Sequence, residues 1–164
     1  MPRICLVVAD AARARILTCE PGDAAADLSP RLVDHVDLVN PERRLRPSQV
    51  HSETRPGTLH GPGGRASGSD DHRDQHREDV DQRFAGEIYR QLGDVLTAYP
   101  ATKAVIVASP HMLGLLRRWI GGLAARRVEV QEVARDLTLE TVPQLHDHLA
   151  DLGLVPARTR RSAT

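Results

Sequence analysis

A Gly-rich, strongly polar stretch separates two well-patterned parts of the chain and constrains the fold more than any other feature. Residues 56–79 read PGTLHGPGGRASGSDDHRDQHRED; they hold 5 of the 12 glycines, and Leu59 is their one large aliphatic side chain. Such a composition cannot fill a hydrophobic core, so we predict a long solvent-exposed loop from about Arg44 to Ser69 that runs directly into a helix. Because long loops in compact domains are usually functional or disordered, we expect this loop to take part in the protein's function.

Three strands are predicted before the loop. The unbroken apolar run Ile4–Ala9 is typical of a buried strand, and a turn follows at Asp10. Arg13–Leu17 then returns as an antiparallel second strand, and Arg31–Leu38 forms a third strand that Asn40-Pro41 ends.

The part after the loop alternates helices and strands. Asp71–Ala98 is predicted as a helix because large apolar residues recur every four positions, at Val80, Phe84, Ile88, Leu92 and Leu96. Lys103–Ser109 is a clearly patterned strand, and Ser109-Pro110 supplies an N-cap and a first-turn proline for the next helix. We expect this helix to stop at Gly121-Gly122 and to bury one face, made of Met112, Leu115, Leu116, Trp119 and Ile120.

A fifth strand and a last helix complete the order of elements. Arg127–Ala134 is predicted as the strand and Thr141–Leu152 as the helix, with Gly153 as its stop and Leu145, Leu149 and Leu152 pointing inward. Three strands followed by helix, strand, helix, strand and helix predict an α/β fold, a mixed five-stranded sheet with helices on both faces. The runs ICLVVA and KAVIVA fit central, doubly covered strands that lie parallel to each other.

Length indicates one domain, and a net charge of zero gives no global electrostatic reason to expect binding to DNA, membranes or polyanions. At 164 residues with a formal net charge of zero, the chain is predicted to form a domain over residues 1–155 and a basic disordered tail over residues 156–164. The N-terminus has no signal-like apolar region and the chain has no run of 18 apolar residues, so we predict a cytoplasmic protein that does not enter membranes. Cys5 and Cys19 are then expected as free thiols that can face each other across the first hairpin.

Three stretches together resemble a known family. They are VVADAARARIL near the N-terminus, the Arg- and Gly-rich loop that ends in GGR, and VIVASPHMLGLLRR followed by VARDLT. Over residues 3–152 the chain resembles the bacterial host attachment protein family, named for a proposed role in attachment to host cells. That family is in turn similar to the central domain of the archaeo-eukaryotic peptide-chain release factors and of the ribosome-rescue protein Pelota. The resemblance implies a ribonuclease-H-like mixed sheet of five strands, which agrees with the predicted order of elements.

The release-factor resemblance implies a specific role for the polar loop. In release factors a Gly-Gly-Gln loop at this place enters the ribosomal peptidyl-transferase centre; here Gly63 and Gly64 match the glycines and Arg65 replaces the glutamine. Because the glutamine is associated with positioning water on the peptidyl-tRNA ester, we expect no hydrolysis and assign no catalytic residue and no cofactor. The resemblance implies a non-catalytic protein that contacts the ribosome, tRNA or other RNA. Arginines leading to the loop tip are predicted to bind phosphates: Arg43, Arg44, Arg46 and Arg55.

Two further patterns keep a metal-dependent hydrolase or nuclease open as an alternative. His72 and His76 lie four residues apart on the predicted helix, a spacing that lets two imidazoles bind one metal ion. Asp10 ends the first strand, where a ribonuclease-H-like nuclease keeps a metal-binding carboxylate, and Glu87 and Asp136 are its remote partners. A solvated helix start and a cap on the hairpin turn explain the same residues without a metal.

A protein–protein module linked to host-cell attachment is the other alternative. Its binding surface would lie outside the loop, around His111 and Arg117. Ser109 and His111 also suggest a nucleophile and a base, but no G-x-S-x-G elbow surrounds the serine and its capping position accounts for it.

Overall fold

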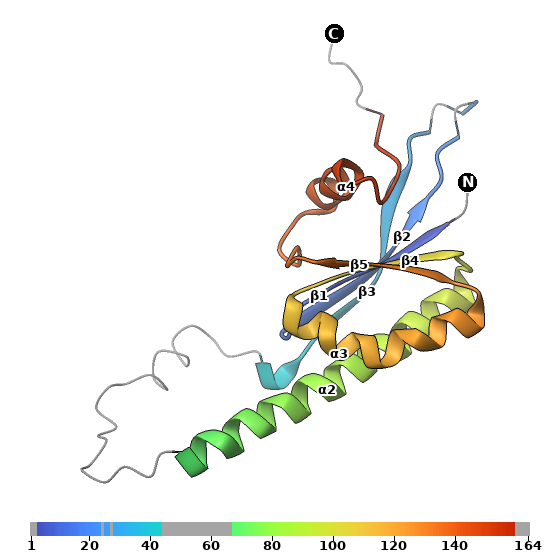
Figure 1. Ribbon diagram of the computed structural model, residues 1–164. Coiled ribbons are helices and arrows are strands. Elements are labelled where there is room, and N and C mark those ends of the chain that lie inside the picture. Colours follow the sequence, from blue (N-terminus) through green and yellow to red (C-terminus); the bar gives the residue numbers. More distant parts are fainter. Residues whose placement is uncertain (1–2, 24, 27, 44–66, 160–164) are drawn as a thin grey trace.

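Within the residues that the structure describes, five strands form one mixed sheet in the order β3-β2-β1-β4-β5 (Figure 1). This computed structural model describes residues 3–23, 25–26, 28–43 and 67–159, without the side chains of residues 67–70. β1 (Ile4–Ala9) pairs antiparallel with β2 (Arg13–Glu20) and parallel with β4 (Lys103–Ala108). β3 (Arg31–Val39) and β5 (Glu129–Ala134) form the two edges. The predicted mixed sheet and its parallel central pair are confirmed.

Helices cover both faces of the sheet, as predicted. α2 (Ser67–Ala98) and α3 (Pro110–Ile120) lie on one face, and α4 (Val142–Asp151) lies on the other (Figure 1). Successive side chains of a strand point to opposite faces, so Val7 packs beneath α2 and α3 whereas Leu6 packs beneath α4. A strand covered on both faces has to be apolar at every position, and this explains the unbroken run in β1.

The long helix α2 packs through the predicted stripe, which is buried at Val80, Phe84, Ile88, Leu92 and Leu96. It begins at Ser67, four residues before the predicted start at Asp71. Residues 71–77 are exposed, and this end of the helix projects past the sheet (Figure 1). Before α2, β3 leads into a short 3₁₀ helix, η1 (Pro41–Arg43).

The ends of α3 correct two predictions. The helix starts after Ser109 with Pro110, as predicted, but the Ser109 hydroxyl makes no capping hydrogen bond. Gly121-Gly122 does not stop the helical path, because the chain continues as a 3₁₀ helix, η2 (Gly121–Arg126). This continuation places Leu123 in the core with no exposed surface. The helical path ends only at Arg127, whose backbone is in the left-handed region with φ 58°. Burial of one more leucine therefore overrides the local glycine signal.

Two apolar residues predicted to be buried are exposed. Leu145 and Leu149 of α4 are fully buried, but Leu152 is 39% exposed because the helix ends before it, at a turn where Gly153 has φ 73°. Trp119 of α3 is 44% exposed, although Met112, Leu115, Leu116 and Ile120 of the same predicted face are buried. Leu113, outside the predicted face, is buried instead, so the buried face of α3 is shifted from the predicted one.

Cys5 and Cys19 do not face each other, which corrects the prediction. Cys5 packs in the core beneath α2 and α3, whereas Cys19 packs in the core beneath α4. Burial raises the pKa of the Cys5 thiol to about 12 and that of the Cys19 thiol to about 11. Both thiols are free and protonated at neutral pH.

The chain after α4 returns along that helix. The carbonyl of Pro156 lies 2.7 Å from His146 Nε2, and Arg158 forms a two-pronged ion pair with Asp147 at 3.0 and 2.7 Å. Among the described residues, none of the helices combines the length and the apolar character needed to cross a membrane.

Candidate interaction surface

Gly63, Gly64 and Arg65, the predicted loop tip, lie outside the described residues, as do the predicted phosphate-binding residues Arg44, Arg46 and Arg55. Arg43 is described, and it is the last residue of η1. Polar and aromatic side chains gather beside η1 and along α2.

Arg43 is fixed to a buried carboxylate on α2. Its Nε donates to Asp81 Oδ1 at 3.0 Å and its Nη2 donates to Asp81 Oδ2 at 2.8 Å. The Asp81 side chain is only 1% exposed, so the pair is shielded from water on the acid's side. A phosphate at Arg43 would have to compete with this carboxylate. The contact instead fastens the end of η1 to α2.

His111, at the start of α3, completes the same cluster. Its Nε2 lies 3.1 Å from Asp81 Oδ2 and 3.6 Å from Glu78 Oε2. Burial disfavours the charged form of Asp81, but hydrogen bonds and charge from Arg43, and then from His111, outweigh it and hold the pKa of this carboxyl below its ordinary value. The prediction that grouped His111 with Ser109 missed its acidic partner, which lies 30 residues away in sequence.

Of the two histidines considered for metal binding, His76 lies beside an acidic residue of η1. His76 Nε2 lies 3.7 Å from Glu42 Oε2 of η1, and its side chain is 70% exposed. Within the described ranges, no group of three or more His, Cys, Asp and Glu side chains has the arrangement to hold a metal ion. The structure therefore adds no support to a metal site at His72 and His76.

Asp10 caps the β1–β2 turn, as its position predicted. Its Oδ1 accepts hydrogen bonds from the backbone N–H groups of Ala12 and Arg13 at 2.8 and 2.7 Å. Its Oδ2 lies 3.0 Å from the buried Thr138 hydroxyl, which is also 2.7 Å from Asp136 Oδ1. The structure brings Asp10 and Asp136 to one hydroxyl, whereas Glu87 lies on α2 in contact with Arg90 and Gln91. The three carboxylates of the nuclease hypothesis are therefore not brought together in one site.

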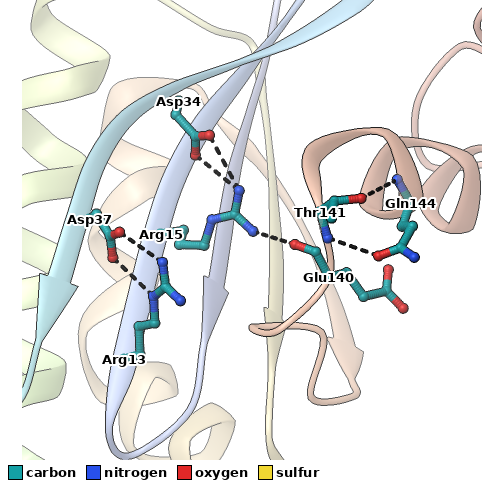
Figure 2. A network of polar contacts seen from close by, with 7 residues as sticks. All are labelled: Arg13, Arg15, Asp34, Asp37, Glu140, Thr141 and Gln144. Atoms are coloured by element: carbon teal, nitrogen blue, oxygen red, sulfur yellow. Dashed lines mark hydrogen bonds and ion pairs between the residues drawn. The ribbon is translucent and has the colours of Figure 1, made fainter.

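A polar network fastens α4 to the outer half of the sheet (Figure 2). Arg15 of β2 donates to the backbone oxygen of Glu140 at 2.8 Å and to both carboxylate oxygens of Asp34 at 3.3 Å. Next to it, Arg13 forms a two-pronged pair with Asp37. Just after Glu140, Thr141 forms a capping box with Gln144 that starts α4. This network is explained by the packing of α4 and needs no ligand.

An exposed aromatic ring forms the main surface feature between α2 and α3. Trp119 lies across Gly86, where an added Cβ would come within 3.1 Å of the indole, and it stacks on Tyr89 with ring centroids 5.9 Å apart. The ring ends an open groove of about 720 Å³ that Asp79, Gln82, Arg83 and Gly86 line along α2. Sequence reasoning missed this groove because it placed Trp119 in the core. Gly86, inside a long helix, was the available signal of close packing.

These features define a single-domain α/β protein with an exposed groove and an exposed tryptophan on its α2–α3 face. The family model described as "Protein required for attachment to host cells" matches residues 5–149. That match spans most of the chain, so the chain belongs to this family. The curated proteins contain no match to the chain.

Proposed function

We propose that this chain is a non-catalytic protein-binding module that supports attachment to host cells. Its partner protein contacts the α2–α3 groove and covers the exposed face of Trp119. The family description provides the attachment role, and the groove provides a surface that suits a protein partner.

The observation that carries this proposal is the exposure of Trp119. A tryptophan that is 44% exposed and backed by Tyr89 and Gly86 presents a large, rigid apolar surface. Tryptophan and arginine are the residue types that contribute most often to binding energy at protein interfaces, and Arg83 lines the same groove. The mixture of Arg83 with Asp79 and Gln82 resembles the polar rim of such an interface.

Complementation of a deletion strain tests the proposal. Trp119→Ala and Arg83→Glu should each lower attachment of the cells to host tissue, because they remove the central ring and reverse a charge at its side. Arg83 is 68% exposed, and its contacts are a 4.0 Å approach to Glu42 and a long 3.4 Å hydrogen bond to the Asp79 backbone oxygen, so its replacement should leave the melting temperature unchanged.

Leu139→Ala is the matched control, since Leu139 is 89% exposed in the segment before α4. This variant should restore attachment fully. Full attachment by both the Trp119 and the Arg83 variants would refute a role for the groove.

A second candidate function is contact with RNA or the translation machinery through the Gly- and Arg-rich segment. Two observations favour it. The resemblance to the release-factor central domain implies a mixed five-stranded sheet, and the chain has a sheet of that kind; the segment also joins β3 to α2, the place of the release-factor loop. The Arg43–Asp81 pair gives the segment a fixed starting point on α2. A cytoplasmic location belongs to this candidate function.

Sedimentation with ribosomes at low and moderate salt distinguishes the two functions. Contacts between arginines and phosphates should weaken steeply as salt rises. Arg65→Ala should weaken the association by about 1 kcal/mol, a factor of about five, and leave the melting temperature unchanged. Equal sedimentation of parent and Arg65→Ala protein would exclude the loop tip and favour the α2–α3 groove.

A further inference from the structure

A β-bulge at His35 places a polar side chain under the C-terminal end of α2. In the β2–β3 ladder Ile16 pairs with Val36 and Leu17 pairs with Asp34, so His35 is the extra residue of β3. Its ring lies against Tyr99, with the centroids 4.2 Å apart. Bulges occur often beside binding sites, where they redirect one side chain, and here the redirected ring faces a cavity.

The hydrogen bond from the Thr18 hydroxyl to Glu20 decides which atom is the donor in the hydrogen bond between His35 and Thr18. The buried hydroxyl of Thr18 lies 2.9 Å from Glu20 Oε1 and 2.7 Å from His35 Nε2. Because the single hydroxyl hydrogen is donated to the carboxylate, His35 Nε2 must donate to the hydroxyl oxygen. In a ring that carries one hydrogen, that hydrogen is then on Nε2 and the lone pair is on Nδ1, which has no hydrogen-bond partner among the described residues. His35 thus offers an acceptor.

The cavity beside this ring is about 500 Å³, within the usual range for small-molecule sites. Its apolar wall includes Leu28, Val33 and Tyr99, and Leu28 is 62% exposed. The loop that carries Leu28 is held by paired backbone hydrogen bonds to Asp23, at 2.9 and 2.8 Å. Gly22 packs so closely on this loop that an added Cβ would meet the Leu28 carbonyl at 2.4 Å. The apolar wall is therefore preformed.

Charge around the cavity favours one anionic group. Glu20 is neutralised by Arg3, whose Nε donates to Oε2 at 3.0 Å and whose guanidinium lies 5.7 Å from the Tyr99 ring centroid. Arg31 also lines the cavity, is exposed, and has no ion pair within the described part of the chain. Two arginines and one glutamate leave the lining with one excess positive charge.

We propose that this cavity binds a small molecule with a planar apolar body, one anionic group and one hydrogen-bond donor. The body packs on Tyr99, Val33 and Leu28, the anionic group binds Arg31, and the donor binds Nδ1 of His35. The cavity lies at the end of α2 at Tyr99, roughly 20 Å along the helix from Gly86, by the helical rise per residue. It is thus a site separate from the α2–α3 groove, and it does not depend on the function proposed for that groove.

Two fluorescent probes test this site. 8-Anilino-1-naphthalenesulfonate has the planar body, a sulfonate and an N–H donor, and N-phenyl-1-naphthylamine is the same body without the sulfonate. The sulfonate probe should bind the folded protein saturably at one site per chain. Arg31→Gln should weaken its binding roughly tenfold, since a hydrogen bond to a charged group is lost. N-phenyl-1-naphthylamine should bind roughly tenfold more weakly than the sulfonate probe and should be indifferent to Arg31→Gln.

Two further variants control for nonspecific binding. Arg118→Gln removes an exposed arginine of α3 and should leave both affinities unchanged. Leu28→Ser alters an exposed side chain, so the protein should remain folded, but both probes should bind more weakly. Failure of the sulfonate probe to saturate, unchanged affinity in Arg31→Gln or Leu28→Ser, or an equal loss in Arg118→Gln would each overturn the proposal.

Discussion

Replacing Arg43 by methionine removes the positive partner of a buried carboxylate. The change keeps an apolar stem of similar length but deletes both hydrogen bonds to Asp81, at 3.0 and 2.8 Å. Asp81, with a side chain 1% exposed, is then left with His111 alone at 3.1 Å. Removing one partner of a buried ion pair destabilises proteins by about 3–5 kcal/mol. Because Arg43 is 28% exposed and His111 remains, we expect the free energy of unfolding to fall by about 2–4 kcal/mol.

Urea unfolding followed by the fluorescence of Trp119, the single tryptophan, measures this loss. The matched control is Arg90→Met on the same helix. Arg90 pairs with Glu87 at 2.6 Å, but both side chains are well exposed, at 60% and 41%, so the free energy of unfolding should hardly change.

The pH dependence provides an independent check of the same reasoning. The pKa of Asp81 is lower in the folded protein than its ordinary value, which is about 4 in an unfolded chain. The stability from its ionised form is therefore fully present above about pH 4 and is lost as the pH falls through the lower, folded pKa. The difference in unfolding free energy between parent and Arg43→Met should be full at pH 7 and shrink below about pH 4. A difference that stays constant from pH 7 to pH 3, or no difference at pH 7, would refute the role assigned to the pair.

Two further substitutions test the placement of the sheet and of α4. Val107→Asp should unfold the protein, since this residue of β4 has no exposed surface and an unpaired buried charge is costly. Val39→Asp is the control and should fold, because Val39 is 48% exposed on the edge strand β3. Circular dichroism compares the two variants, and native-like melting of the Val107 variant would contradict the central placement of β4. Arg15→Met should lower the unfolding free energy by about 1–3 kcal/mol, because the Glu140 carbonyl loses its donor while the half-exposed Asp34 stays hydrated. The backbone amides of α4 should also exchange their hydrogens with solvent faster. Unchanged hydrogen exchange at Leu145 and Leu149 would show that the network does not hold α4.

Most elements were predictable because their causes are local. The apolar run of β1, the four-residue stripe of α2 and the Ser109-Pro110 start of α3 all appear at the predicted places. Backbone geometry fixes these periods, so a chain that buries one face shows them in its sequence. The ends of elements were harder to predict: Gly121 signalled a stop, but burial of Leu123 carried the helical path onward.

The sequence by itself determined the α/β order of elements and which strands are covered on both faces, since continuous or alternating apolar patterns record burial directly. Tertiary structure alone decided the contacts of the proposed sites. Arg43 meets Asp81 38 residues along the chain, and the half-exposed Trp119 packs against Gly86 of another helix. His35 meets Thr18 and Tyr99 only because a bulge in β3 shifts the register. Each of these contacts joins residues far apart in the sequence, which no helical or strand repeat connects. The distance between the two residues and their burial are therefore set by how the sheet and helices pack.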